Sequence, residues 1–90
     1  RGTINWPGFG PAGENWLGFI FLVTRYSGMP FPANEEGKLD WHALDSLHAL
    51  PMWEGDRFFL PLVFDDDPRI FYGCMPYRDG RPLGWHFRRA

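Results

Sequence analysis

The glycines between residues 8 and 13 are the first feature of this sequence that could do chemistry. Gly8, Gly10 and Gly13 match the pattern G-x-G-x-x-G, which binds a dinucleotide pyrophosphate when a full strand precedes it and a helix follows it. Here only a few residues come before the glycines, and a run of strand-forming residues comes after them. Pro7 and Pro11 make the segment denser still in turn-forming residues. We therefore predict a flexible loop and no dinucleotide site.

Zinc binding and nucleophilic catalysis have little support. The histidines are His42, His48 and His86, and with a single cysteine their spacing matches no zinc site. Cys74 lies in an apolar, strand-like run, which favours a buried, inert thiol and excludes a disulfide within the chain. Neither of the serines stands in a nucleophile-elbow pattern.

Aromatic rings and carboxylates occur together at three places further along the chain. Glu35-Glu36 precede Trp41 by a few residues, and the segment Met52-Trp53-Glu54-Gly55-Asp56 follows a short helical stretch. Phe71-Tyr72-Gly73 then opens a strand after an acidic turn. This ordered set is the most informative part of the sequence.

The set resembles the C-terminal half of Nudix hydrolases and is closest to their MutT-like branch, which hydrolyses oxidised purine nucleoside triphosphates. The resemblance runs from Arg1 to Phe87, and its most specific parts are residues 36–41, 52–59 and 71–73. It implies a mixed sheet between helices, of which this chain would hold the part that follows the catalytic box. It also implies a purine nucleotide as ligand, and Mg²⁺ or Mn²⁺ as the metal of the parent family.

The resemblance also gives roles to individual residues. It places Trp53 where the family stacks a tryptophan on the purine, and Asp56 where an acid bonds the edge of the base. Trp6 and Trp16 fall at pocket-lining positions, and Glu36 falls where the family often has a further metal-binding or base carboxylate. Each residue has a structural alternative. The tryptophans could pack in a core or an interface, Asp56 could favour the helix dipole, and Glu36 could be a solvated loop residue.

Two departures from the family pattern affect the expected chemistry. The closest enzymes carry two adjacent acids where this chain has Gly55-Asp56. The Nudix box, G-x5-E-x7-R-E-U-x-E-E-x-G-U with U apolar, is also absent. Gly8 and Glu14 satisfy its first spacing, but Leu22-Val23 stand where Arg-Glu is required. In the parent family the box comes just before the segment that matches the start of this chain. We therefore expect no catalytic residue, no bound cofactor and no diphosphatase activity from this chain alone.

Composition narrows the classes of protein and partner. Ninety residues suit a single domain, and a content of 44% hydrophobic and 19% aromatic residues excludes a disordered segment. The net charge of −2 argues against binding to nucleic-acid polymers, and no apolar run reaches the length of a membrane span. The single cysteine suits a reducing cytoplasm. We expect the arginines near the end to form a solvated tail; they are Arg78, Arg81, Arg88 and Arg89.

The hydrophobic pattern predicts an α+β fold with a partial mixed sheet, one main helix and a C-terminal β-hairpin. We expect strands at about residues 3–6, 16–26, 38–42, 70–77 and 83–87, and helical segments at about 45–50 and 54–64. The run 16–26 is nearly all apolar, which favours a buried central strand. Asp45 should cap the short helix, Pro61 should kink or break the main one, and Asp79-Gly80 should form a hairpin turn.

Four functional hypotheses remain open. The first is a truncated relative of a nucleotide pyrophosphohydrolase, inactive alone. The second is a non-catalytic module that binds a nucleotide or another planar ligand. The third is a self-associating scaffold, because loss of the leading strands should expose the apolar strand at 16–26 and favour a homo-oligomer. The fourth is an enzyme completed by a separate chain that carries the box.

Overall fold

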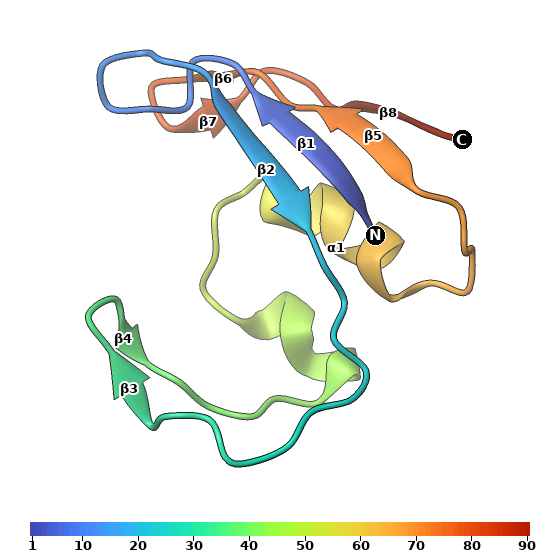
Figure 1. Cartoon of the computed structure of the whole chain (residues 1–90). Helices are drawn as coiled ribbons and strands as arrows, with labels where there is room; N and C mark the ends of the chain where they lie inside the picture. Colours follow the sequence, from blue (N-terminus) through green and yellow to red (C-terminus); the bar gives the residue numbers. More distant parts are fainter.

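The computed structural model describes all 90 residues, and its centre is a four-stranded mixed sheet with a helix against one face (Figure 1). The strands are β1 (Gly2–Trp6), β2 (Trp16–Ile20), β5 (Phe71–Cys74) and β8 (His86–Arg89), in the order β2-β1-β5-β8. β1 pairs antiparallel with β2 and parallel with β5, and β5 pairs antiparallel with β8. The expected α+β fold with a mixed sheet is confirmed.

The core forms between the sheet and helix α1 (Asp56–Phe64). Alternate residues of a strand face opposite sides, so Ile4 of β1 and Phe71 of β5 both face the helix. Phe59 and Val63, four residues apart and therefore on one side of α1, meet them there. The buried core consists of Ile4, Phe59, Val63, Phe71, Met75 and Tyr77. Burial of each apolar side chain of this size contributes about 1.5–3 kcal/mol.

Pro61 lies inside α1, and the helix is not broken there, since it runs on to Phe64; the alternative, a kink at this proline, stays a prediction. Proline has no amide hydrogen to donate to the Arg57 carbonyl, so the helix continues with one hydrogen bond fewer. The apolar contacts of Phe59 and Val63 on either side of the proline hold the turn in place. α1 is the longer of the two helical segments, and neither is long and apolar enough to cross a membrane.

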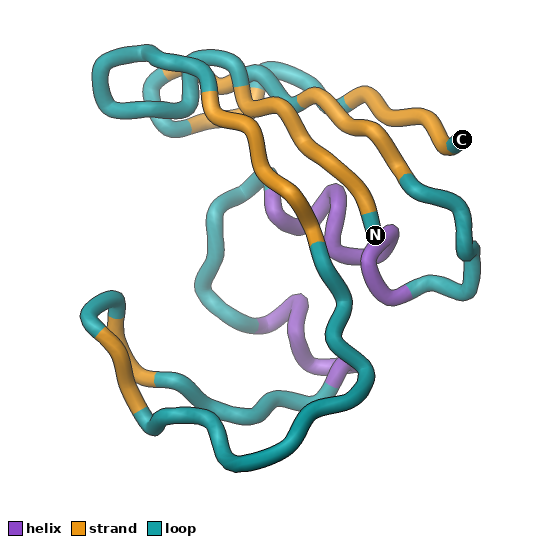
Figure 2. Tube along the Cα trace, in the orientation of Figure 1, coloured by secondary structure: helices purple, strands orange, loops and turns teal.

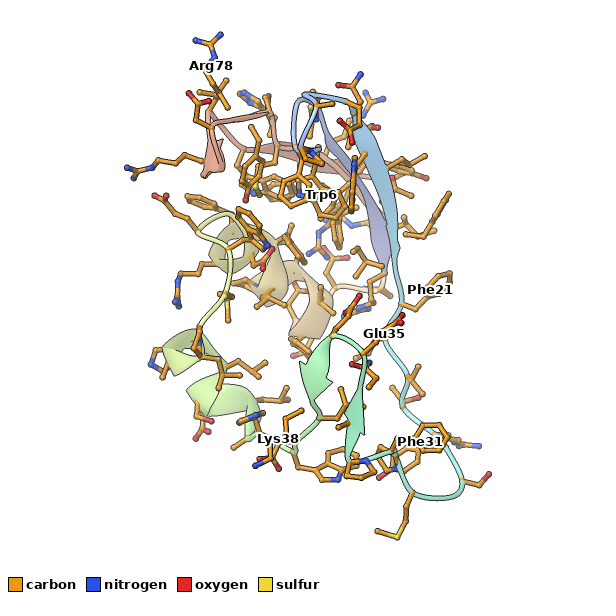
Figure 3. All side chains as sticks on the ribbon, turned by 90° about the vertical axis from the view of Figure 1, so that its left-hand side faces the viewer. Trp6, Phe21, Phe31, Glu35, Lys38 and Arg78 are labelled. Atoms are coloured by element: carbon orange, nitrogen blue, oxygen red, sulfur yellow. The ribbon has the colours of Figure 1, made fainter.

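The run 16–26 is not the buried central strand that its apolar content predicts. β2 ends at Ile20 and lies at the edge of the sheet, paired with β1 alone. Phe19, Phe21 and Val23 are 65%, 81% and 70% exposed. Figure 3 shows Phe21 pointing away from the helix and sheet. Apolar composition identified a strand correctly but could not tell an edge from a centre, because that depends on which strands are present to pair with it.

Residues 21–52 form an excursion that leaves the sheet after β2 and returns just before α1 (Figure 2). It contains a small hairpin, β3 (Ala33–Asn34) with β4 (Gly37–Lys38), and the 3₁₀ helix η1 (Leu44–Ala49). The strand expected at 38–42 is therefore wrong beyond Lys38. The short helix exists, but Ala43 occupies its N-cap position and no side chain caps it, so the expected role of Asp45 is also wrong. Every residue from 21 to 46 is exposed.

The segment after β5 makes a tight turn. β6 (Tyr77–Arg78) and β7 (Arg81–Pro82) pair around Asp79 and Gly80, whose φ angles are +51° and +77°. Positive φ at both central residues is the geometry that favours Asp-Gly in two-residue hairpins. The expected hairpin turn is confirmed, but the expected strand 70–77 is two strands, because β5 ends at Cys74. Cys74, expected to be buried, is half-buried.

The acidic turn between α1 and β5 is held by two arginines. Arg1 donates from Nε to the Val63 carbonyl at 2.8 Å and from a guanidinium nitrogen to the Asp67 carbonyl at 3.2 Å. Arg89 binds the Asp65 carboxylate at 2.6 Å and the Asp67 carboxylate at 3.1 Å. The Arg89 side chain is only 8% exposed, so the prediction of a solvated basic tail is wrong at this residue.

The chain thus has two regions. We call residues 1–20 and 53–90 the sheet–helix unit, and residues 21–52 remain the excursion.

Candidate functional site

A cleft of about 600 Å³ lies between the glycine-rich loop and the β6–β7 hairpin. Trp16 and Trp53, both proposed as ligand contacts from the sequence, line this cleft although 37 positions separate them. They are 49% and 52% exposed, so each ring has a free surface. The remaining lining residues are Gly8, Phe9, Gly10, Pro11, Gly13, Tyr77, Arg78, Asp79 and Gly80.

Phe9 is the ring on which the others converge. Its centroid lies 5.3 Å from that of Trp16, 5.0 Å from that of Trp53 and 4.9 Å from that of Tyr77. The interplanar angles are 70°, 68° and 84°, so each contact is edge-to-face. Two exposed indole rings therefore make edge-to-face contacts with one central phenyl ring. Such a surface can take a flat, apolar-faced ligand.

The glycine-rich loop is closed by its own hydrogen bonds. The Gly8 amide donates to Asn15 Oδ1 at 3.1 Å, and the Gly10 amide donates to the Glu14 carbonyl at 3.0 Å. The Ala12 amide donates to Glu14 Oε2 at 2.9 Å. These amides are therefore not free to hold a phosphate, and strand β2 rather than a helix follows the loop. The loop presents Phe9 instead.

The position of Trp53 is set by the start of α1 and by the hairpin. The Asp56 amide donates to the Trp53 carbonyl at 3.0 Å, which turns the chain into the helix. A carbon added at Gly80 would lie 3.6 Å from the Trp53 ring, so the hairpin tip is in contact distance of the indole. Glu54 and Arg81 form an ion pair of 3.2 Å between the same two segments. Both side chains are more than half exposed, so this pair orients the segments more than it stabilises them.

Gly55 explains why the chain has one acid where its resemblance to the family leads us to expect two. It is buried, and a Cβ at this position would overlap Met75 Sδ and the Tyr77 hydroxyl. Burial raises the pKa of Tyr77, and a hydrogen bond with the Gly55 backbone partly offsets that rise. A side chain at residue 55 would have to displace these two core side chains, so packing favours glycine at this position.

Asp56 and Trp6, the other two proposed ligand contacts, do not line the cleft. Asp56 lies in the first turn of α1, where burial raises the pKa of its carboxyl and a hydrogen bond with the Trp53 backbone partly offsets the rise. Trp6 lies between the cleft and the core (Figure 3), with ring centroids 6.3 Å from Phe9 and 6.2 Å from Phe59. Trp6 therefore contacts a cleft residue and a core residue, and Asp56 contacts only the backbone of Trp53.

Glu36, the proposed metal ligand, lies in the exposed turn of the β3–β4 hairpin, in the excursion. Its amide donates to Asn34 Oδ1 at 2.9 Å, which is an ordinary turn contact. No group of three or more His, Cys, Asp or Glu side chains is placed to hold a metal ion. Mg²⁺ and Mn²⁺ need several oxygen ligands around one point, so these residues do not form a site for either ion on their own.

Comparison with known proteins gives the family. Over 64 residues, or 71% of the chain, the sequence is 40% identical to a protein of Bacillus subtilis (strain 168) described as the uncharacterized Nudix hydrolase YvcI. This chain is a Nudix-related domain. It spans only 40% of that relative's length. No family model and no solved structure matches the chain.

The cleft of this Nudix-related domain also contains residues that the sequence does not single out as ligand contacts, among them Phe9, Tyr77 and Asp79. Phe9 was read as part of a flexible loop, and Asp79 only as a turn residue. A single aromatic residue between two glycines was the available signal, and in the structure this ring is partly buried and packs against the core. Nothing in the sequence shows that the loop at 8–13 and the turn at 79–80 meet.

Proposed function

We propose that this Nudix-related domain binds a purine nucleotide, with the base stacked in the aromatic cleft, and that the 90 residues do not hydrolyse it alone. The observation that carries the proposal is the convergence of Trp16 and Trp53 on Phe9. Stacking of a base on one aromatic side chain contributes about 1–3 kcal/mol and requires no particular base. The match to a Nudix hydrolase supports a nucleotide over other planar ligands.

In this proposal the four residues suggested by the family resemblance have different parts. Trp53 and Trp16 contact the base directly. Trp6 supports Phe9 from the core side, at 6.3 Å between centroids. The backbone N–H of Asp56 donates to the Trp53 carbonyl at 3.0 Å and so holds the Trp53 backbone at the start of α1.

The absence of hydrolysis follows from the carboxylates. Diphosphate cleavage by this family needs metal ions held against the phosphates, and a metal needs converging ligands. The Arg-Glu pair of the Nudix box is missing from the sequence, and Glu36 stands apart from the cleft. We further propose that the chain corresponds to the post-box half of the MutT-like branch, in line with its 40% share of the relative's length.

Binding is tested by calorimetric titration of the chain with GMP and AMP, without metal. Trp53→Ala should weaken both affinities by about 5- to 150-fold, because one stacking surface is lost. Trp41→Ala is the matched control: it is an exposed tryptophan of the excursion, and it should leave both affinities unchanged. Equal loss in the two variants, or saturable binding that neither variant affects, would place the ligand elsewhere. Mg²⁺-dependent turnover of a nucleoside triphosphate by the chain alone would contradict the second half of the proposal.

Self-association is a second candidate function, and edge strand β2 favours it. β2 pairs on one side only, and Leu17 and Phe19 on it are 57% and 65% exposed. No charged residue occurs from Trp16 to Val23, so nothing on this strand opposes pairing with a second copy. Sedimentation should therefore show a homo-oligomer at micromolar concentration, and Phe19→Lys should return it to monomer. A monomeric parent chain at micromolar concentration would contradict self-association as a function.

A further inference from the structure

We propose that Asp79, at the tip of the β6–β7 hairpin, is the residue that selects the ligand of the cleft, and that it selects heterocycles with two adjacent N–H donors. The inference rests on the proposed function, since it concerns the same cleft. It differs from the family resemblance, which gives the role of bonding the edge of the base to Asp56, the residue after Gly55.

Asp79 is the only carboxylate among the residues that line the cleft. Its side chain makes no hydrogen bond and no ion pair within the chain, whereas Asp65, Asp67 and Glu54 all do. Arg78, its neighbour, extends away from the body of the molecule in Figure 3. The cleft is therefore lined by one carboxylate that has no partner within the chain.

The hairpin fixes the backbone of Asp79. Its φ of +51° is set by the two-residue turn, and Gly80 with φ of +77° completes that turn. On one side β6 is bound to the start of the glycine-rich loop, where the Tyr77 amide donates to the Pro7 carbonyl at 2.7 Å. On the other side Gly80 approaches the Trp53 ring. Asp79 thus lines the same cleft as the Trp53 indole, next to the hairpin position that approaches that ring.

The alternative acids are excluded by their surroundings. Residue 55 cannot carry a side chain without displacing Met75 and Tyr77. Asp56 is bound to the backbone of Trp53 and does not line the cleft. Glu14 lies close by, but its carboxylate accepts the Ala12 amide and closes the loop. Asp79 is the acid that remains.

An ionised carboxylate only accepts hydrogen bonds, and its two oxygens match a pair of parallel N–H donors. A 2-amino-4-oxopyrimidine ring offers such a pair, its ring N–H beside its amino group. Adenine offers an amino group beside a ring nitrogen that is itself an acceptor, so a carboxylate would repel half of that edge. Guanine nucleotides and pterins both contain the 2-amino-4-oxopyrimidine ring, and both are flat enough to stack.

The experiment compares four probes by calorimetric titration: GMP, IMP, AMP and neopterin. IMP is GMP without the 2-amino group, so it has lost one of the two donors. GMP should bind the parent chain at least about tenfold more tightly than IMP or AMP, because a hydrogen bond to a charged group is lost. Asp79→Asn should reduce that preference to less than threefold, since an amide no longer offers two acceptors. Asparagine accepts positive φ, so the hairpin should keep its shape.

Matched measurements separate this inference from the proposed function. Asp66→Asn changes an exposed acid of the α1–β5 turn and should leave the GMP preference intact. If Trp53→Ala weakens every probe but Asp79→Asn leaves the GMP to IMP ratio unchanged, stacking stands and the role of Asp79 is overturned. If the parent chain binds none of the four probes, both proposals fail. Binding of neopterin above GMP supports the edge chemistry and assigns it to pterins; the reverse order assigns it to guanine nucleotides.

Discussion

The sheet–helix unit and the excursion are built from equally apolar sequence but fold to different degrees. All 10 buried residues of the chain belong to the sheet–helix unit. In the excursion Phe21, Phe31 and Trp41 are 81%, 79% and 69% exposed. Figure 1 shows the excursion extending below the sheet and helix as a separate lobe. Apolar composition alone therefore does not decide what is buried.

Pairing partners make the difference. In the sheet–helix unit, β1 is paired on both sides and β5 links it to β8, so each strand completes a face that α1 can cover. The excursion has a hairpin with two residues in each strand, and one ring stack, Tyr26 on Trp41 at 5.9 Å. Two-stranded hairpins of this size are marginal in water unless something packs on them. The apolar residues between positions 21 and 46 stay exposed because no layer lies over them, whereas Leu47, Leu50 and Met52, close to α1, are partly buried.

Loss of a ring from each region is the sharpest way to test this contrast. Phe71→Ala should lower the free energy of unfolding by about 3–5 kcal/mol, because the ring is 1% exposed and its removal leaves a cavity. Phe31→Ala removes the same atoms from an exposed site and should change the free energy of unfolding by less than about 0.5 kcal/mol. Urea unfolding followed by circular dichroism measures both. Similar losses in the two variants would mean that the excursion packs as tightly as the core.

Gly55→Ala tests how closely the sheet–helix unit is packed at the cleft. The added carbon meets Met75 Sδ and the Tyr77 hydroxyl, so we expect a loss of about 1–3 kcal/mol from overpacking. The same unfolding experiment applies. A variant as stable as the parent would show that Met75 can move aside, and packing would then no longer explain the missing second acid.

The loss of stability at low pH should depend on the turn that joins α1 to β5. A hydrogen bond from Arg89 holds the pKa of Asp65 below its ordinary value, and Arg69 does the same for Asp67. Each carboxylate therefore stabilises the fold fully above its unfolded pKa near 3.8, and this contribution is lost as pH falls below that value.

The double variant Asp65→Asn, Asp67→Asn should be less stable at pH 7 and should lose less stability than the parent between pH 4 and pH 2. Urea midpoints measured across this range provide the check. Asp66→Asn, in the same turn but outside the ion pairs, should keep the parent's loss of stability at low pH. An unchanged slope in the double variant would show that the arginines do not hold these carboxylates in solution.

The smallest effect is expected from the ring stack of the excursion. Trp41→Ala removes the contact with Tyr26, yet global unfolding should change by no more than about 0.5 kcal/mol, since both rings are exposed. Amide exchange between residues 21 and 46 should be fast in the parent and in the variant alike. Slow exchange there in the parent would mean that the excursion is ordered by contacts of its own.

Local rules predicted much of the sheet–helix unit. Asp79-Gly80 predicted the hairpin turn, and the residue pattern at 54–64 predicted the main helix. The failures lie where the outcome depends on distant partners. The predicted strand at 16–26 is too long, and it lies at the edge of the sheet and not at its centre. Its apolar run contains no information about which strands pair with it. Arg89 was placed in solvent, because its partners Asp65 and Asp67 are more than 20 positions away.

The candidate site was predictable only in part, because it also depends on segments that are distant in the sequence. Trp16 and Trp53 were proposed together from the family resemblance, and the structure brings both to one cleft. Phe9 and Asp79 were missed, because each looks like a loop residue until the loop and the hairpin are seen side by side. Asp56, expected to bond the edge of a base, lies at the start of α1 and does not line the cleft.

The parallel pairing of β1 with β5 also has a consequence for how the chain folds. Gly2 lies opposite Phe71, so the central pair of the sheet joins the two ends of the sequence and must wait until the excursion has been looped out. Closing a loop becomes harder only slowly with length, by about 0.6 kcal/mol for each doubling, but that entropy must be lost before the pair forms. A chain with residues 21–52 replaced by a short flexible linker should therefore fold faster while unfolding at nearly the same rate.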